Sequence, residues 1–463
     1  MSPSKHYDAI VIGSGQGGTP LCQALAEAGM RTALVEREHI GGTCINEGCT
    51  PTKTIIASGR VAYLTRRGAD YGVKSGVLHI AMERIRKRKR DIVNKFRTGS
   101  EKRIQKTARL DLIYGEAAFA GAESLEVRLR KGGVTTLHAE RIFINAGCRP
   151  AIPTLNGLND VPFLDSTSIM ELARVPQHLL VLGGGYVGLE FGQLFRRLGS
   201  RVTIVQNGAQ LLAREDEDVA KEVAKILKED GVEVLLETKA ESAARSRSGI
   251  VLKVRSKRGA RTVVGTHLLV ATGRVPNTEA LRLAAAGIVT DQRGFIPVDN
   301  KLQTNVSGVF ALGDINGGPA FTHISYDDFR IIRTNVIEKG SATTTHRFVP
   351  YTVFIDPQLG RVGLTEAQAR EEGRKVRVAK MPMTYVARAM ETAETRGFMK
   401  AVVDAATDQI LGAAVLGIEG GEIMSQLEIA MMGKLPYTVL KDAVFAHPTL
   451  AESLNNLFGH FES

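Results

Sequence analysis

The sequence predicts an α/β protein with two similar parallel-sheet domains and a third, α+β domain at the C-terminal end. A strand, a glycine-rich turn, a helix and a second strand follow one another from Tyr7 to Glu36, and the same order returns from His178 to Val205. Strands that alternate with helices favour parallel sheets with helices on both faces. After Arg347 come shorter strand-like segments, VPYTVFI and FMKAVVD, and then helical patterns near 421–432 and 449–458.

Length and composition agree with a globular chain of several domains. The 463 residues exceed what one hydrophobic core usually supports, and 43% apolar with 24% charged residues is ordinary for such proteins. Four cysteines are too few for a disulfide framework in a chain of this length. The first strand begins at Tyr7, which leaves no room for a signal peptide, and no stretch is apolar enough to cross a bilayer. We therefore expect a cytoplasmic protein without membrane contact.

Much of the formal charge of +11 lies in one basic run. Ile85, Ile92 and Phe96 recur at roughly helical spacing around it, which favours the solvated face of a helix. The run carries no interleaved aromatics and no nucleic-acid module, so we expect no nucleic-acid partner. Its cations are Arg84, Arg86, Lys87, Arg88, Lys89 and Arg90.

The first glycine turn has the form GxGxxG, with Gly13, Gly15 and Gly18 directly after the strand that ends at Ile12. The first glycine permits a tight turn, the second lets phosphates approach the backbone, and the third allows close packing of helix on strand. The helix N-terminus then offers N–H groups to a pyrophosphate. Glu36 ends the next strand, where a carboxylate accepts hydrogen bonds from ribose hydroxyls. The pattern predicts a dinucleotide site.

A close cysteine pair lies in GTCINEGCTPTK, residues 42–53. Four residues separate Cys44 from Cys49, so a loop containing Gly48 can bring the two sulfurs together. Pro51 is well placed to open a helix, which puts Cys49 near a helix N-terminus that favours the thiolate. Lys53 then falls on the same helix face. No further Cys or His follows at zinc spacing, so the alternatives are a redox-active pair, which we favour, and two inert buried cysteines.

A second glycine turn follows in GGGYVGLE. It places Gly183, Gly185 and Gly188 after its strand, and two dinucleotide folds in one chain imply two different nucleotides.

A candidate acid–base pair lies near the C-terminus, where His447 stands five residues before Glu452. A histidine can take and return a proton near neutral pH, and a carboxylate orients its ring.

Taken in order, these motifs resemble the class I pyridine nucleotide-disulfide oxidoreductases, which include dihydrolipoamide dehydrogenase, glutathione reductase and mercuric reductase. The resemblance covers essentially the whole chain through GSGQGG, GTCINEGCTPTK, GGGYVGLE, ATGRVPN, TNVSGVFALGD and AHPTLAE. It implies an enzyme that uses FAD and NADPH or NADH, without a resident metal. It also implies two Rossmann-like domains, for FAD (1–152 and 273–345) and NAD(P) (153–272), and a C-terminal α+β dimerisation domain (346–463).

The resemblance also implies residue roles. Cys49 is the sulfur nearest the flavin and Cys44 the thiol that meets the acceptor. Lys53 lies near flavin N5 and pairs with Glu190, and His447 with Glu452 serves the dithiol of the partner subunit in an obligate homodimer. The implied FAD contacts are Gly13, Gly15, Gly18, Glu36, Gly42, Thr43, Lys53, Gly147 and, on the ribityl chain, Asp314. The implied NAD(P) contacts are Gly183, Gly185, Tyr186 (over the flavin), Gly188, Glu190, Gln206 and Gly273.

Differences from individual members of the family limit the choice of electron acceptor. Phe445 stands where dihydrolipoamide dehydrogenases have a second histidine, and the chain ends without the vicinal cysteines of mercuric reductases. Segments from Phe321, Val349 and Leu435 resemble the reactive-chlorine-resistance flavoproteins, which implies a small-molecule disulfide or a soft metal ion such as copper(II) as acceptor, in oxidative or metal defence. Dihydrolipoyl dehydrogenase is the alternative, ahead of mercuric reductase. A neutral Gln206 favours NADPH slightly.

Overall fold

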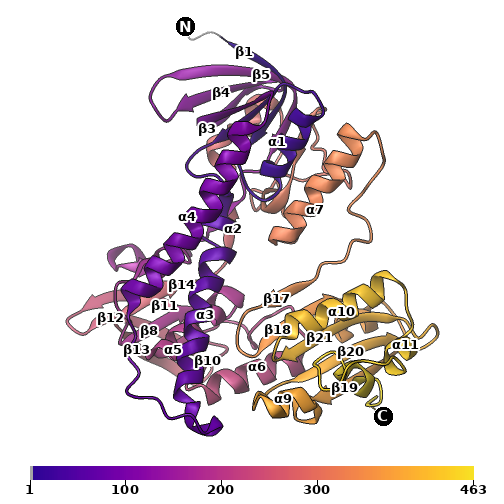
Figure 1. Ribbon diagram of the computed structural model, residues 1–463. Helices are drawn as coiled ribbons and strands as arrows, with labels where there is room; N and C mark the ends of the chain where they lie inside the picture. The colour runs from indigo at the N-terminus through magenta and orange to yellow at the C-terminus, as the bar shows by residue number, and fades with distance from the viewer. Residues whose placement is uncertain (1–3, 463) are drawn as a thin grey trace. The chain divides into compact units, whose positions relative to one another are not determined.

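The computed structural model describes residues 4–462. The chain divides into two compact units. One comprises Met1–Thr54, Arg84–Ala151 and Gly273–Arg347, and the other comprises Ile55–Glu83, Ile152–Thr272 and Phe348–Ser463. Each unit contains sheets and helices, which confirms the predicted α/β class (Figure 1).

The first unit is built on a mixed sheet. β1, β2, β5 and β16 form parallel pairs, and β2 also pairs in parallel with the first half of β3. The second half of β3 runs antiparallel to β4, which pairs antiparallel with β5. The strands are β1 (Lys5–Ile12), β2 (Thr32–Glu36), β3 (Leu110–Gly121), β4 (Ser124–Leu129), β5 (Val134–Ile144) and β16 (Val309–Ala311), and a ribbon joins β6 (Cys148–Pro150) to β15 (Arg274–Pro276).

Apolar residues of β1 point to both faces of this sheet. Ile10 and Ile12 belong to one apolar cluster, and Ala9 and Val11 to another that includes helix residues. A strand buried on both faces is what a parallel sheet requires, and it explains the continuous apolar run at the start of the sequence. The helices of this unit are α1 (Gly18–Glu27), α2 (Gly42–Asn46), most of α4 (Met82–Lys106) and α7 (Thr322–Ile332).

The second unit contains three sheets. A parallel sheet has the order β10-β9-β8-β14-β7, from β7 (Phe163–Leu164), β8 (His178–Leu182), β9 (Arg201–Val205), β10 (Glu233–Leu235) and β14 (His267–Val270). An antiparallel sheet joins β11 (Lys239–Ser246), β12 (Gly249–Ser256) and β13 (Gly259–Gly265). The third has the order β17-β18-β21-β20-β19, from β17 (Tyr351–Val353), β18 (Gln358–Gly363), β19 (Val376–Pro382), β20 (Phe398–Asp404) and β21 (Ile410–Gly417).

The second unit also contains helices. Most of α3 (Cys49–Arg66) belongs to the second unit, although its first turn belongs to the first unit. The others are α5 (Tyr186–Leu198), α6 (Glu217–Glu229), α8 (Glu366–Glu371), α9 (Ala387–Glu391), α10 (Gly420–Met432), α11 (Tyr437–Lys441) and α12 (Ser453–Leu457). The helix expected near 421–432 is α10, whereas the pattern near 449–458 gives only the short helix α12.

The basic run lies on a helix, α4, as predicted, but the residues on the buried face of α4 differ from those that the spacing predicted. Phe96 is 53% exposed, and Met82, Val93 and Ile104 are buried instead. Lys89 is only 4% exposed and takes part in polar interactions, so the expectation of a wholly solvated charged face is wrong there. A lysine has a four-carbon stem that packs like an apolar side chain, which sequence spacing does not reveal.

Candidate redox and nucleotide sites

The first glycine turn is closed by backbone contacts. Gly13 has a φ of +94°, and a Cβ there would lie 2.4 Å from the carbonyl oxygen of Asn145. A Cβ on Gly18 would lie 2.1 Å from the carbonyl oxygen of Gly13. The N-cap residue of α1 is Gly17, which has no side chain to cap the helix, so the N-terminus of α1 leaves room for a pyrophosphate.

Glu36 closes the same loop from the end of β2. Its Oε2 accepts hydrogen bonds from the backbone N (3.0 Å) and Oγ (2.6 Å) of Ser14, and its Oε1 accepts one from Glu38 N (2.8 Å). The carboxylate is 9% exposed. It therefore fixes the loop directly, and it lies where the sequence placed a ribose acceptor.

Asn145, at the end of β5, is a residue that the sequence analysis missed. Its Oδ1 accepts from Gly18 N (2.9 Å), while its Nδ2 donates to Leu312 O (2.8 Å). One buried amide thus joins the first glycine turn to the segment that leads to Asp314. An asparagine that ends an apolar strand and precedes a glycine, in NAGC, is the signal that was available.

The cysteine segment lies against the first glycine turn. Gly42 has a φ of +58°, and a Cβ there would lie 2.7 Å from the Cα of Gly15. The backbone N of Gly41 donates to Ser14 Oγ (3.1 Å). Thr43 follows in α2 with an exposed side chain. A side chain at Gly42 would therefore push the cysteine segment away from the glycine turn.

Cys44 and Cys49 lie together, as predicted, and both are free thiols. Cys49 is the first residue of α3, and Lys53 follows one turn later. A hydrogen bond between the two thiols raises the pKa of Cys44 well above its usual range, and burial adds to the effect. Since Cys44 holds its proton, Cys49 at the helix N-terminus is the sulfur that the arrangement favours as thiolate.

The ribityl candidate Asp314 follows β16 in the turn Gly313–Asn316. Burial raises the pKa of its carboxyl group, although nearby Arg274 opposes the shift. The buried Asp328 accepts from Gly313 N (2.8 Å) and so holds the turn. Gly147 and Gly273 have positive φ values, and a Cβ on either would meet open space.

The second glycine turn repeats this design. Gly183 has a φ of +115°, and a Cβ there would lie 2.3 Å from the carbonyl oxygen of Ala271. A Cβ on Gly188 would lie 2.2 Å from Gly183 O, whereas a Cβ on Gly185 would meet open space. Protein packing does not explain a glycine at Gly185, and the open space beside its backbone would let a pyrophosphate approach. Uncapped α5 begins at the half-exposed Tyr186.

The second unit holds the other predicted site residues: Gln206, Glu190 and the His447–Glu452 pair. Gln206 Oε1 accepts from Gly184 N (2.9 Å), and Glu190, 4% exposed, accepts from Phe354 N (2.9 Å). His447 Nδ1 lies 3.0 Å and 2.9 Å from the two carboxylate oxygens of Glu452, so the structure brings this pair together. The ion pair between Lys53 and Glu190 stays a prediction, because the two residues belong to different units.

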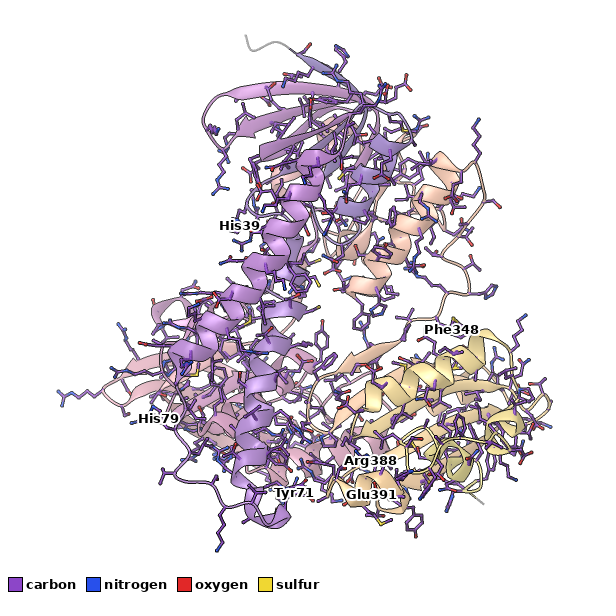
Figure 2. The ribbon with its side chains drawn as sticks, viewed as in Figure 1. His39, Tyr71, His79, Phe348, Arg388 and Glu391 are labelled. Carbon is purple, nitrogen blue, oxygen red and sulfur yellow. The ribbon has the colours of Figure 1, made fainter. Side chains whose placement is uncertain are left out.

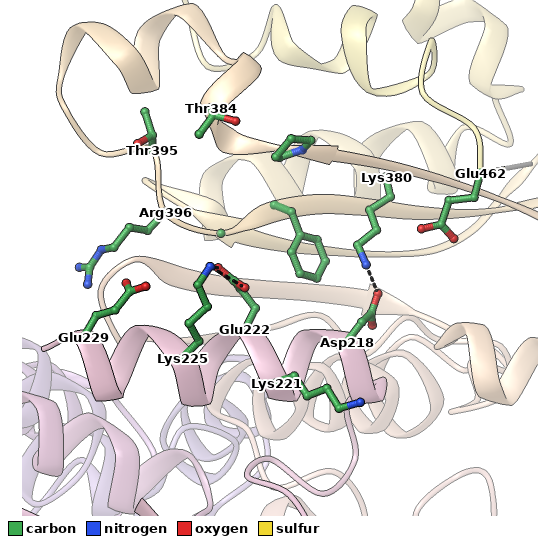
Figure 3. A pocket seen from close by; sticks show the side chains of 13 residues that line it. Asp218, Lys221, Glu222, Lys225, Glu229, Lys380, Thr384, Thr395, Arg396 and Glu462 are labelled. Carbon is green, nitrogen blue, oxygen red and sulfur yellow. Dashed lines mark hydrogen bonds and ion pairs between the residues drawn. The ribbon is translucent and has the colours of Figure 1, made fainter. Parts of the chain in front are cut away.

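The remaining cysteines, Cys22 and Cys148, are buried. Burial raises the pKa of Cys22 to about 12 and, as the largest cause, the pKa of Cys148 to about 12. Figure 2 draws the side chains that the structure describes. Among these described residues, no three His, Cys, Asp or Glu side chains gather as metal ligands. A groove of about 810 Å³ between α6 and β19–β20 is lined by paired charges such as Asp218 and Lys380, and by none of the predicted site residues (Figure 3).

Comparison with known proteins defines the class. Residues 7–328 match the family model described as pyridine nucleotide-disulphide oxidoreductase, and residues 349–458 match the dimerisation domain of that family. The chain therefore belongs to the pyridine nucleotide-disulfide oxidoreductases. It is an enzyme of the flavoprotein kind that uses FAD and NAD(P)H, and it carries a dimerisation domain, as the resemblance implied.

Individual relatives cover nearly the whole chain. It is 38% identical over 456 residues to the "Probable pyridine nucleotide-disulfide oxidoreductase RclA" of Escherichia coli K12, spanning 98% of both proteins. It is 33% identical over 451 residues to a mercuric reductase of Lysinibacillus sphaericus, spanning 97% of this chain and 81% of that protein. A solved Cu(II) complex of the HOCl-induced flavoprotein disulfide reductase RclA from Escherichia coli superposes with a TM-score of 0.89 at 37% identity, spanning 98% of this chain and 99% of that one.

A dihydrolipoyl dehydrogenase of Staphylococcus aureus is 32% identical over 446 residues, spanning 96% of this chain and 94% of that protein. The relatives thus include both alternatives that the sequence left open. Within residues 4–462, no helix combines the length and the apolar character that a membrane span needs.

Proposed function

We propose that this enzyme passes electrons from NAD(P)H through FAD to the Cys44–Cys49 pair and on to a small disulfide or a soft metal ion, in oxidative or metal defence. The observation that carries the proposal is the hydrogen bond between the thiols of Cys44, in α2, and Cys49, at the start of α3, with the α2 segment against the first glycine turn. The relative RclA supports it, since it is a flavoprotein disulfide reductase known as a Cu(II) complex. Dihydrolipoyl dehydrogenase activity is the second candidate, ahead of mercuric reduction.

The two glycine turns would hold the nucleotides. We assign 1–152 and 273–345 to FAD, 153–272 to NAD(P)H and 346–463 to dimerisation. When bound, FAD supplies hydride acceptance from NAD(P)H and electron delivery to a disulfide. The proposed FAD contacts are Gly13, Gly15, Gly18, Glu36, Gly42, Thr43, Lys53, Gly147 and Asp314, and the proposed NAD(P)H contacts are Gly183, Gly185, Tyr186, Gly188, Glu190, Gln206 and Gly273.

The two cysteines have different roles in the transfer of electrons to a disulfide acceptor. Cys44, the protonated thiol of the reduced pair, gives up its proton and attacks the acceptor, and Cys49 resolves the mixed disulfide. Because the pKa of Cys44 is raised, its attack needs a base. We assign that base to His447, which Glu452 orients through Nδ1, leaving Nε2 to exchange the proton.

In our proposal this base serves the partner subunit of an obligate homodimer. Large apolar side chains are exposed along the C-terminal segment, as a surface awaiting a second copy would have them. They are Ile429, Met432, Leu435, Val439 and Val444. We further propose NADPH as the preferred reductant, on the neutral Gln206, and the cytoplasm as the compartment, where free thiols stay reduced.

The test is NAD(P)H oxidation by the holoenzyme with Cu(II), glutathione disulfide and lipoamide as separate acceptors. We expect turnover with Cu(II) or a disulfide, and a loss of at least about a hundredfold in Cys44→Ser, since removing a nucleophile abolishes covalent transfer. Cys148→Ala is the matched control, because it removes a buried cysteine outside the pair. Fast turnover with lipoamide alone would favour the dihydrolipoyl dehydrogenase alternative, and full activity of Cys44→Ser would overturn the dithiol mechanism.

A further inference from the structure

Thr322 places a hydroxyl group beside both redox sulfurs. Its Oγ1 lies 3.3 Å from Cys49 Sγ, within hydrogen-bonding distance, and the same hydroxyl group contacts Cys44. Thr322 is the first residue of α7, as Cys49 is of α3, so two helices begin at this contact, and the first turn of each lies in the first unit. The N-terminus of a helix carries a partial positive charge. The surroundings of the pair therefore favour a negatively charged sulfur.

We propose that Thr322 is a third catalytic residue of the redox centre, whose hydroxyl group donates a hydrogen bond to the Cys49 thiolate of the reduced pair. The proposal rests on the proposed function, since it requires that the cysteine pair is reduced in turnover. Two electrons from NAD(P)H break the S–S bond between Cys44 and Cys49. One proton goes to the Cys44 sulfur, and the Cys49 sulfur keeps the negative charge.

The two hydrogen-bond donors at Cys49, the Cys44 thiol and the Thr322 hydroxyl group, differ in whether they keep their proton during turnover. The Cys44 thiol donates to Cys49 only while it keeps its proton, and it loses that proton when it attacks the acceptor. The hydroxyl group of Thr322 keeps its proton throughout, because an alcohol does not ionise in this pH range. The contact also lowers the pKa of Cys44, against the larger effects that raise it. Thr322 thus stabilises charge on the pair after the thiol donor is gone.

A purely steric role for Thr322 makes a different prediction. Valine keeps the β-branched shape of threonine and removes the hydroxyl group, whereas serine keeps the hydroxyl group and removes a methyl group. If the hydroxyl group acts, Thr322→Ser behaves as the parent and Thr322→Val does not. If shape acts, the order reverses.

The test is a pH titration of the FAD-loaded Cys44→Ser protein, in which Cys49 is the remaining redox thiol. A thiolate beside oxidised flavin gives long-wavelength charge-transfer absorbance, and its midpoint reports the pKa of Cys49. We expect Thr322→Val to raise this midpoint by about one pH unit, a tenfold change, because a charge-assisted hydrogen bond is lost. Thr322→Ser should restore the parent midpoint. A Thr322→Val midpoint equal to the parent, or a Thr322→Ser midpoint shifted as far, overturns the proposal.

A second measurement separates this proposal from the proposed function. The rate of Cys49 alkylation by iodoacetamide is followed against pH by mass spectrometry in the same proteins, and it requires no contact with flavin. If the absorbance is missing from every variant, the placement of Cys49 beside flavin fails, while alkylation still tests Thr322. If alkylation shows no shift in Thr322→Val, the role of Thr322 fails, whatever the absorbance shows.

Discussion

At the scale of single residues, a side chain at the end of a strand holds each glycine turn, a carboxylate in the first turn and an amide in the second. Glu36 and Gln206 each end a strand and accept a hydrogen bond from the backbone N of the second residue of a turn, Ser14 and Gly184 respectively. The sequence predicted Glu36 as a ribose contact, and the resemblance implied Gln206 as an NAD(P) contact. It did not show that the same side chains also hold the turns, since that depends on a rotamer and not on spacing.

The substitution Gln206→Glu tests the assigned nucleotide site. Glutamate can still accept from Gly184 N, but its charge repels a 2′-phosphate, so we expect the ratio of kcat/KM for NADPH over NADH to fall about tenfold or more. Steady-state kinetics with both nucleotides measure this ratio. The nearby Gln210→Glu is the control for added charge. An unchanged ratio in Gln206→Glu would remove this residue from the site.

The burial of Cys22 should make the folding stability of the protein depend on pH in the alkaline range. The pKa of Cys22 is raised to about 12 by burial, so the unfolded chain ionises first and folding stability falls as the pH rises from about 9 to about 12. Below pH 9 this contribution is fully present. We expect Cys22→Ala to show a smaller loss of melting temperature than the parent between pH 8 and pH 10.5, measured by circular dichroism. Equal losses would contradict the assignment.

At the scale of elements, the sequence predicted the strands, turns and redox helix because each has a local signal. Glycines with positive φ, the strand before each turn and a proline three positions into α3 all act on the backbone nearby. Asn145 and Thr322 were missed for the opposite reason. Their partners lie far along the chain, at Leu312 and Cys49, so no local pattern announces them.

Asn145→Ala should loosen the first nucleotide site. Its loss leaves the N–H of Gly18 without its acceptor, which costs about 1–3 kcal/mol for a buried group. We expect weaker FAD retention, by about tenfold or more at this cost, measured as release of flavin fluorescence on dilution. The exposed Asn94→Ala on α4 is the matched control. Equal retention in the two variants would show that Asn145 does not support the site.

At the scale of the whole molecule, the sequence predicted the class of enzyme and its dimerisation domain, but not how Lys89 and Phe96 are distributed on α4. The exposed apolar residues of the C-terminal segment are likewise visible only in the structure. Helical spacing shows which residues share a face, and it does not show which face meets solvent or a second copy.

Ile429→Asp should separate the subunits. Ile429 is 63% exposed on α10, and a buried unpaired charge at a subunit interface is strongly unfavourable. We expect a monomer in sedimentation velocity that retains FAD and loses disulfide turnover, because in our proposal His447 acts on the dithiol of the partner subunit. Val289→Asp, at a 53% exposed position of the first unit, is the control. An active monomer would contradict the composite site.

The central claim is that electrons from NAD(P)H reach Cys44 and Cys49. The most direct measurement treats the oxidised holoenzyme anaerobically with one equivalent of NADPH, alkylates it and locates the labels by mass spectrometry. Our account predicts new labels on Cys44 and Cys49, with Cys22 and Cys148 unlabelled before and after, since both are buried. Bleached flavin absorbance with Cys44 and Cys49 unchanged in their labelling would contradict it.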